Sequence, residues 1–203
     1  MSTSSSLWQR SLADFQHAVE TRSTPGCGAA AALNGCLGLS LVLKGVRLHR
    51  GEQQADRRQR LVADGDALQR SLAEAVDDDA EAFARYLEVL QLPDGNDAES
   101  RRRESALSEA RNASIEIPLT AAEQCRAGLS LAVEALSLTS PAMRSDTLAG
   151  ATLLKAALDA LLIGVEANLE SLPDQGPQRE LEVRCTELRD RARSHCQRLE
   201  IGA

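Results

Sequence analysis

Aromatic residues are almost missing from this chain of 203 amino acids. Phenylalanine, tyrosine and tryptophan together make up 2% of the sequence, whereas hydrophobic residues as a whole make up 43%. A core must therefore be built from leucine, alanine and valine, and the first two of these are strong helix formers. A chain of this length can bury a sizeable core in one domain. The scarcity of aromatics thus favours helices over a sheet.

Positive charge is also in short supply. Asp and Glu outnumber Lys and Arg by 30 to 23, the formal net charge is −7, and Lys44 and Lys155 are the only lysines. Surfaces that bind nucleic acid carry a basic excess that neutralises phosphates. The charge balance therefore argues against a nucleic-acid partner.

Metal-binding motifs are absent as well. The five cysteines form no CxxC pair and have no zinc-type spacing: Cys27, Cys36, Cys125, Cys185 and Cys196. The three histidines are isolated in the sequence: His17, His49 and His195. We expect reduced cysteines that serve as small hydrophobic residues, no metal ion and no permanently bound cofactor.

Targeting segments are not evident. Residues 1–6 are polar and rich in serine, without the basic start and apolar run of a signal peptide. The longest apolar stretch, residues 29–43, is interrupted by Asn34 and is shorter than the ~20 residues that cross a bilayer. We therefore predict a cytoplasmic protein without membrane contact, in which residues 1–6 are disordered.

What the sequence does contain is a glycine-bearing turn, Ser23-Thr24-Pro25-Gly26-Cys27-Gly28, that leads directly into the apolar residues 29–43. A helix with no polar face has to be buried by other helices. Gly35 and Gly38 each cost up to about 1 kcal/mol relative to alanine inside a helix, so their presence indicates close packing. The stretch predicts a central helix whose positive N-terminal end is opened by a loop.

Apolar residues recur every three or four positions along the rest of the chain. This pattern predicts amphipathic helices over residues 8–19, 53–90, 98–137 and 178–199, and a second apolar helix over residues 143–172. Pro118 should kink or split the fourth of these six helices. No stretch alternates with period two. We predict one all-α domain over residues 1–203, a bundle of about six helices with the second and the fifth at its centre.

Four landmarks occur in order along the chain, and together they resemble a known family. They are Thr24-Pro25-Gly26-Cys27-Gly28-Ala29-Ala30-Ala31; Asp79-Ala80-Glu81-Ala82-Phe83 with Leu92-Pro93 behind it; Ile117-Pro118-Leu119 with Cys125; and Ser145-Asp146 followed by Asn168. The chain resembles the formiminotetrahydrofolate cyclodeaminases and methenyltetrahydrofolate cyclohydrolases from about Leu7 to Leu199.

The resemblance implies an all-helical homodimer with a folate site at the subunit interface. Its substrate would be 5-formimino- or 5,10-methenyltetrahydrofolate, so the expected partner is a small tetrahydrofolate derivative. The formiminotransferase domain that is fused to some members is absent from these 203 residues. This absence favours the cyclohydrolase reaction.

Both reactions need one or two acidic groups in a dry cleft. In the first, water attacks a methenyl carbon within a cationic ring, and a carboxylate can stabilise the cation and take the proton. In the second, ammonia needs a proton to leave. Asp146 and Asp79 are the two candidate catalytic residues. The structural alternatives stay open: Asp146 as a charge at a helix N-terminus, and Asp79 as part of a solvated face.

The candidate substrate-binding residues are Pro25, Gly26, Cys27, Gly28, Ser145 and Asn168. The glycine turn could present backbone N–H groups to an anionic part of the ligand, such as the folate glutamate carboxylate, or could simply connect two packed helices. Asn168 lies late on an apolar helix and needs a hydrogen-bond partner, in the ligand or in the backbone. A thiol at position 27 could be a nucleophile, but the chemistry needs none.

Several polar positions of the family are changed in this chain. Arg47 and Glu52-Gln53-Gln54 replace an asparagine and lysines, Thr139-Ser140-Pro141-Ala142 replaces a Gly-Asn-x-Asn run, and Gly164 replaces an asparagine. Two alternatives therefore remain: a non-catalytic homologue that binds a pterin or a protein, and a helical interaction module. In the latter, a surface for a partner could be formed by Arg47, Arg57, Arg58 and Arg60.

Overall fold

The computed structural model describes residues 6–170, 172 and 175–201, and this part of the chain contains helices joined by loops, with no strand. The helices are η1 (Leu7–Gln9), α1 (Leu12–Thr21), α2 (Cys27–Arg47), α3 (Ala55–Leu90), α4 (Asp97–Leu138), η2 (Pro141–Met143), α5 (Arg144–Leu169) and α6 (Gln175–Leu199). The prediction of an all-α bundle of about six helices is confirmed. The expected disorder of residues 1–5 lies outside the described residues.

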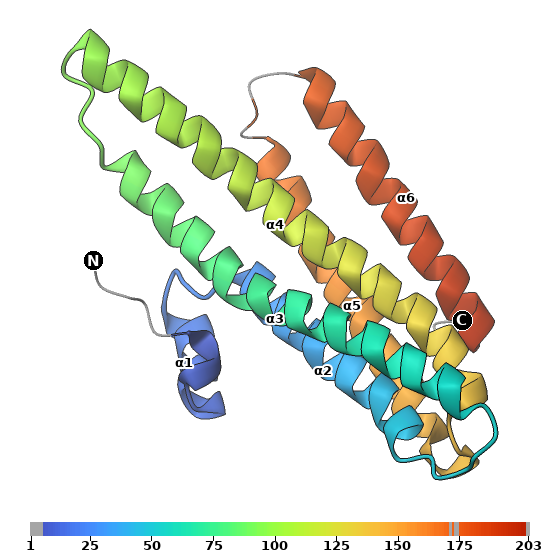
Figure 1. Ribbon diagram of the computed structural model, residues 1–203. Helices are drawn as coiled ribbons and strands as arrows, with labels where there is room; N and C mark the ends of the chain where they lie inside the picture. The colour runs from blue at the N-terminus through green and yellow to red at the C-terminus, as the bar shows by residue number, and fades with distance from the viewer. Residues whose placement is uncertain (1–5, 171, 173–174, 202–203) are drawn as a thin grey trace.

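The bundle has two main layers. Helices α3 and α4 form a long antiparallel hairpin that packs on α2 and α5, and the tip of the hairpin extends beyond the other helices (Figure 1). Helix α6 lies along α4 and α5. The most extensive contact between any two elements is that of α2 with α5, so the second and fifth helices are central as predicted.

Two glycines set the distance between these central helices. A Cβ atom at Gly38 would lie 2.7 Å from the Gly150 carbonyl oxygen, and one at Gly150 would lie 2.4 Å from the Gly38 carbonyl oxygen. The two backbones therefore touch, and no side chain larger than hydrogen fits at either position. Close packing explains why glycine is used in the middle of both helices despite its low helix propensity.

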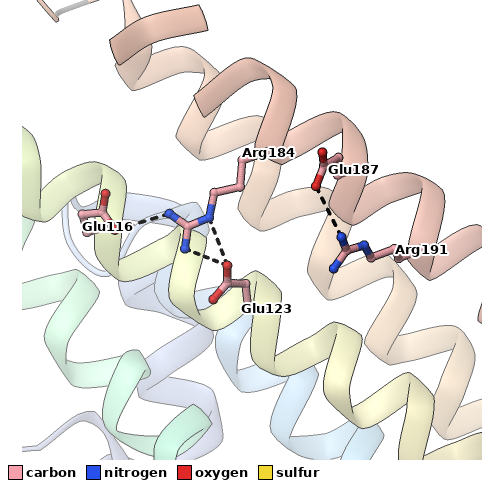
Figure 2. A network of polar contacts seen from close by, with 5 residues as sticks. All are labelled: Glu116, Glu123, Arg184, Glu187 and Arg191. Atoms are coloured by element: carbon pink, nitrogen blue, oxygen red, sulfur yellow. Dashed lines mark hydrogen bonds and ion pairs between the residues drawn. The ribbon is translucent and has the colours of Figure 1, made fainter. Parts of the chain in front are cut away.

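Helix α6 is joined to the bundle by ion pairs. Arg184 donates to Glu123 Oε1 from Nε and Nη2, at 3.0 and 2.7 Å, and its Nη1 lies 4.0 Å from Glu116 of the same helix α4 (Figure 2). Arg189 pairs with Glu166 of α5 through both carboxylate oxygens. These pairs are partly exposed, so they contribute little stability singly and serve mainly to orient α6.

The N-terminal segment differs from the prediction of one helix over residues 8–19. The chain forms a 3₁₀ turn at Leu7–Gln9 and starts α1 only at Leu12, because the Ser11 side chain caps that helix by accepting from the Asp14 amide at 3.1 Å. Leu12 is consequently 82% exposed. Ser6, which was expected to be disordered, donates from Oγ to Asp77 Oδ2 at 2.6 Å.

Pro118 does not split the fourth helix. Helix α4 runs without interruption from Asp97 to Leu138 with Pro118 inside it. Residues 29–43 were predicted to be too short to cross a bilayer, and the helix that contains them is longer than this apolar stretch. The helix is 21 residues long, and both α2 and Pro141–Leu169 are long and apolar enough for a span, yet 61% and 44% of their most apolar windows are buried inside the bundle.

One side of the central layer is not covered by any described helix. Leu37 of α2 is 54% exposed and Ile163 of α5 is 63% exposed. Small residues at Ala149, Ala156 and Ala167 continue the exposed stripe along α5. The expectation that the apolar second helix is buried on every side is therefore wrong within one chain. We refer to this stripe of α2 and α5 as the open face.

The contact between α2 and α5 can be tested with a glycine variant. Gly150→Ala should force the two backbones apart, so we expect a loss of about 2–4 kcal/mol and a Tm lower by about 5–15 °C in thermal unfolding followed by circular dichroism. Gly176→Ala is the matched control, because nothing lies within 4 Å of a Cβ there. It should leave the Tm unchanged or slightly raised. Equal Tm values for the two variants would contradict the backbone contact.

Candidate functional site

A cavity of about 250 Å³ opens at the N-terminus of α2. The turn before α2, the middle of α3 and α4, and the last turns of α5 all contribute to its wall. The residues that line it are Ser23, Gly26, Cys27, Gly28, Asp79, Phe83, Ser114, Pro118, Gly164, Ala167 and Asn168. The structure thus brings together residues from three of the four landmarks identified in the sequence and part of the remaining one, Asn168.

Asp79 caps α2 from a neighbouring helix. Gly26 stands at the N-cap and has no side chain with which to accept from the first helical amides. The Ala29 amide instead donates to Asp79 Oδ2 at 2.8 Å. This contact meets the general need of a helix N-terminus for an acceptor and places a negative charge at the positive end of the helix dipole.

Gly28 is required for this arrangement. A Cβ atom at position 28 would lie 2.0 Å from Asp79 Oδ1 and 2.5 Å from Asp79 Cγ. The carboxylate therefore lies directly against the backbone of α2, which only glycine allows. No described group accepts a hydrogen bond from the amides of Cys27 or Gly28, so this end of α2 can still donate to a ligand.

The environment of Asp79 changes its acidity. Burial raises the pKa of the Asp79 carboxyl above its usual value, and the hydrogen bond from Ala29 opposes this rise. Burial is the larger effect because desolvation disfavours the charged form. A carboxyl with a raised pKa, facing a cavity, is suited to exchange protons with a bound molecule.

The three consecutive aspartates of α3 have three different surroundings. Asp77 accepts from Ser6 Oγ and from the Leu7 amide, so it holds the N-terminal segment. Asp78 is exposed, and burial together with Glu74, Glu81 and Asp77 raises the pKa of its carboxyl. Asp79 alone of the three faces the cavity.

Asn168 reaches the cavity from α5. Its Nδ2 donates to the Ser114 carbonyl oxygen of α4 at 2.9 Å. The sequence predicts that an amide at this position needs a hydrogen-bond partner, and a backbone carbonyl provides one. The Asn168 side chain also forms part of the cavity wall. Neither Ser114 nor Phe83 was named as a site residue from the sequence, although Ser114 lies four residues before Pro118 and Phe83 four residues after Asp79.

The other candidate acid lies elsewhere in the subunit. Asp146 begins α5, where its Oδ2 is 3.0 Å from Lys44 Nζ near the end of α2. Since α2 rises ~1.5 Å per residue, this pair is about 25 Å from the cavity. Ser145 is exposed beside it. Within one chain, Asp79 lies next to the glycine turn and Asp146 does not, so the two candidate catalytic residues are not brought together.

The remaining predicted residues are divided between the cavity and the core. Pro25 is buried just outside the residues that line the cavity. Cys27 is an exposed free thiol in the cavity wall, while the other four cysteines are free and buried. Burial raises the pKa of the Cys36 thiol to about 12. Among the described residues, no group of three or more His, Cys, Asp or Glu could hold a metal ion.

The fold and the site define a class: an all-helical domain with a cavity in which a partly buried acid lies against the N-terminus of a central helix. The formiminotransferase-cyclodeaminase family model matches residues 11–187, and the chain belongs to this family. The methenyltetrahydrofolate cyclohydrolase of Methylorubrum extorquens is 31% identical over 159 residues, which are 75% of each chain.

Two other relatives agree with this assignment. The formimidoyltransferase-cyclodeaminase of Mus musculus is 36% identical over 123 residues, which are 58% of this chain but only 23% of that longer protein. The crystal structure of formiminotetrahydrofolate cyclodeaminase from Thermotoga maritima has the same fold, with a TM-score of 0.82, 20% sequence identity and 95% coverage of both chains. The resemblance inferred from the four landmarks is confirmed.

Replacing Asp79 should separate its charge from its capping role. Asp79→Asn keeps an oxygen that can accept from Ala29 and removes a charge whose pKa is raised by burial. In the wild type, the free energy of unfolding falls as the pH rises through the interval between the pKa of Asp79 in the unfolded chain and its raised pKa in the folded protein. The asparagine side chain does not ionise, so the variant does not lose stability in this way. At pH values above that interval we therefore expect its Tm to equal that of the wild type or to be up to ~3 °C higher.

The control for this measurement is Asp79→Ala, which removes the acceptor and should cost about 1 kcal/mol. Thermal unfolding between pH 4 and pH 8 distinguishes the two variants. A large loss of stability in Asp79→Asn near neutral pH would mean that the charge itself stabilises the fold, which would contradict the dominant effect of burial.

Proposed function

We propose that this protein is a folate one-carbon enzyme that hydrolyses 5,10-methenyltetrahydrofolate to 10-formyltetrahydrofolate, with Asp79 as its proton acceptor. The observation that carries this proposal is the contact of Asp79 with the N-terminus of α2 inside the cavity, in a chain of this family. The methenyltetrahydrofolate cyclohydrolase of Methylorubrum extorquens, 31% identical over 75% of this chain, supports the cyclohydrolase reaction over the alternatives. We place the enzyme in the cytoplasm.

The proposed reaction has two steps. A water oxygen bonds to the methenyl carbon, and the Asp79 carboxylate takes one of its protons, which leaves a neutral carbinol between the two folate nitrogens. The bond from this carbon to N5 then breaks, Asp79 returns its proton to N5, and the hydroxyl loses its proton to solvent as the formyl group forms. Hydrolysis of the cationic ring therefore releases one proton, and Asp79 ends ionised.

The N-terminus of α2 is the proposed binding point for an anionic part of the ligand. The amides of Cys27 and Gly28 point from a helix end that carries partial positive charge. The folate glutamate carboxylate is the group that fits this site. Asn168 and the Gly26 turn, which both line the cavity, would then contact the ligand as well.

Deamination of 5-formiminotetrahydrofolate is the second candidate reaction. In that reaction N10 attacks the formimino carbon, the bond to the terminal nitrogen breaks, and ammonia leaves with a proton. The raised pKa of Asp79 favours this role too, because it increases the fraction of carboxyl that can act as an acid near neutral pH. Both reactions use the same residue on the same carbon atom.

We further propose that two copies of the chain pair through the open face. The exposed stripe contains Leu37 and Ile163 and runs along α5 to Ala167, which lines the cavity. A volume of about 250 Å³ is also below the roughly 300–1,000 Å³ of most ligand pockets, so a second subunit at its rim would complete it. A large exposed apolar patch is the usual sign of such an interface.

A two-fold contact gives Asp146 a role. If the two-fold axis is perpendicular to α2 and passes near Leu37, the two copies of α2 are antiparallel, and the start of each lies next to the end of the other. Asp146 of the partner subunit, with Ser145, would then approach the cavity that contains Asp79. This arrangement reconciles the 25 Å separation within one chain (about seventeen residues of helix) with two acids at one site.

Activity can be tested against an adjacent aspartate. Asp79→Asn should reduce the rate of methenyltetrahydrofolate hydrolysis by about 10²–10⁴-fold, because it removes the proton acceptor. The control Asp78→Asn deletes the neighbouring carboxylate, which is exposed and outside the cavity, and should stay within twofold of the wild type. The assay follows the absorbance of the conjugated methenyl ring.

The pH dependence gives a second readout of the same experiment. Because Asp79 must be ionised and its pKa is raised, kcat/KM should fall with decreasing pH at values above those of an ordinary aspartate. Catalysis that is unaffected in Asp79→Asn would exclude the proposed acceptor.

The wild type itself distinguishes the alternatives. If tetrahydrofolate stabilises the purified protein but the protein accelerates neither reaction, it is a non-catalytic homologue. If the protein shows neither stabilisation nor catalysis, it is an interaction module.

Mixed dimers test the role of Asp146. If each site uses Asp79 of one subunit and Asp146 of the partner subunit, homodimers of Asp79→Asn and of Asp146→Asn are both inactive. A heterodimer of the two variants keeps one intact site, so random exchange of equal amounts should restore about 25% of wild-type activity. No recovery after verified subunit exchange would contradict a site shared between the subunits, whereas an active Asp146→Asn homodimer would exclude Asp146 from catalysis.

A further inference from the structure

Pro118 creates a gap in the hydrogen bonds of α4 at the cavity wall. A residue in a helix normally donates its N–H to the carbonyl four residues earlier, and proline has no N–H to donate. Ser114 is the residue four positions before Pro118, and both residues line the cavity. The Ser114 carbonyl is therefore deprived of its usual donor in α4 at a place where burial would make an unpaired oxygen costly.

Asn168 supplies the missing donor from another helix. Its Nδ2 lies 2.9 Å from the Ser114 carbonyl oxygen, and this bond joins α5 to α4 in a partly buried environment. A carbonyl oxygen can only accept, so it must be the NH₂ end of the amide that faces Ser114. The bond thereby fixes which way the Asn168 amide is turned, and its carbonyl oxygen faces away from Ser114.

We propose that Pro118 is a positioning residue of the candidate site. By withholding an N–H from α4, it reserves the Ser114 carbonyl for Asn168 and holds the Asn168 amide in one orientation in the cavity wall. An ordinary residue at position 118 would donate to the Ser114 carbonyl as well, so Asn168 would share this acceptor and its bond would be weaker. The consequence for ligand binding rests on the proposed function, whereas the hydrogen-bond exchange does not.

The exchange of donors is tested by a double-mutant cycle of thermal stability. In the wild type, Asn168→Ala leaves the Ser114 carbonyl without a donor and should lower the Tm by about 3–8 °C. In a Pro118→Ala background, the new N–H at position 118 satisfies the same carbonyl, so the second change should lower the Tm by no more than about 2 °C. Equal losses in the two backgrounds would overturn the inference.

A measurement on the unmodified protein covers the case in which Pro118→Ala does not fold. The side-chain amide hydrogens of Asn168, followed by ¹⁵N NMR, should exchange with solvent at least about tenfold more slowly than those of Asn112, which is an exposed asparagine on α4. Exchange at the same rate for the two amides would show that the bond to Ser114 does not hold Asn168.

Kinetics then test the positioning role in the enzyme. Pro118→Ala should raise the KM for 5,10-methenyltetrahydrofolate by about tenfold and leave kcat within about twofold, since Asp79 stays in place. Pro93→Ala, at an exposed proline between α3 and α4, is the control and should change neither value. An unchanged KM in an active Pro118→Ala enzyme overturns the positioning role, whereas an inactive wild type contradicts only the proposed function and leaves the stability cycle as the test.

Discussion

The contact between the backbones of α2 and α5 is the constraint on which the rest of the structure depends. Gly38 and Gly150 allow the two helices to touch, near the middle of α2 and within the first third of α5. Fixing that crossing also fixes what meets at each end. At one end Cys27 comes next to Gly164 at the cavity, and at the other Lys44 meets Asp146. The cavity and the ion pair are therefore two consequences of one close approach.

This packing also explains why a single chain has an open face. Two apolar helices in one layer are covered on one side by the α3–α4 hairpin, and no described helix covers their other side. With α6 along the edge formed by α4 and α5, the outer stripe that contains Leu37 and Ile163 remains exposed. Burying that stripe against a second copy would remove apolar surface from water at about 25 cal/mol per Å². Completing the core and completing the site would then be the same event.

Much of this architecture could be predicted from the sequence because it follows from local rules. The glycine turn before α2, the two central apolar helices and the all-α class depend on helix periodicity and composition, which are visible along the chain. Asp79 was also identifiable, through the landmark that it shares with Phe83. The location of Asp146 was not, because distance along a sequence does not tell which end of a helix faces a site.

The surroundings of Pro118 could not be predicted from the sequence either. A proline in a helical pattern predicts a kink or a break when only the local chain is considered. Helix α4 instead stays continuous, and a side chain from α5, fifty-four residues away in sequence, donates to the carbonyl that the proline leaves. A rule about backbone hydrogen bonds cannot reveal such a donor, since it exists only after the helices have packed.

Two opposing effects determine the free energy of the ionised Asp79 carboxylate at the cavity. Burial of the carboxyl costs free energy in its charged form, and the pKa rises accordingly. The bond from Ala29 and the positive end of α2 recover part of that cost without removing it. If the N-terminus of α2 had a capping side chain of its own, Asp79 would lose this contact and the carboxylate would have less reason to remain there. The bare glycine cap is thus what keeps an acid at the cavity with a pKa between that of a surface aspartate and that of an uncompensated buried one.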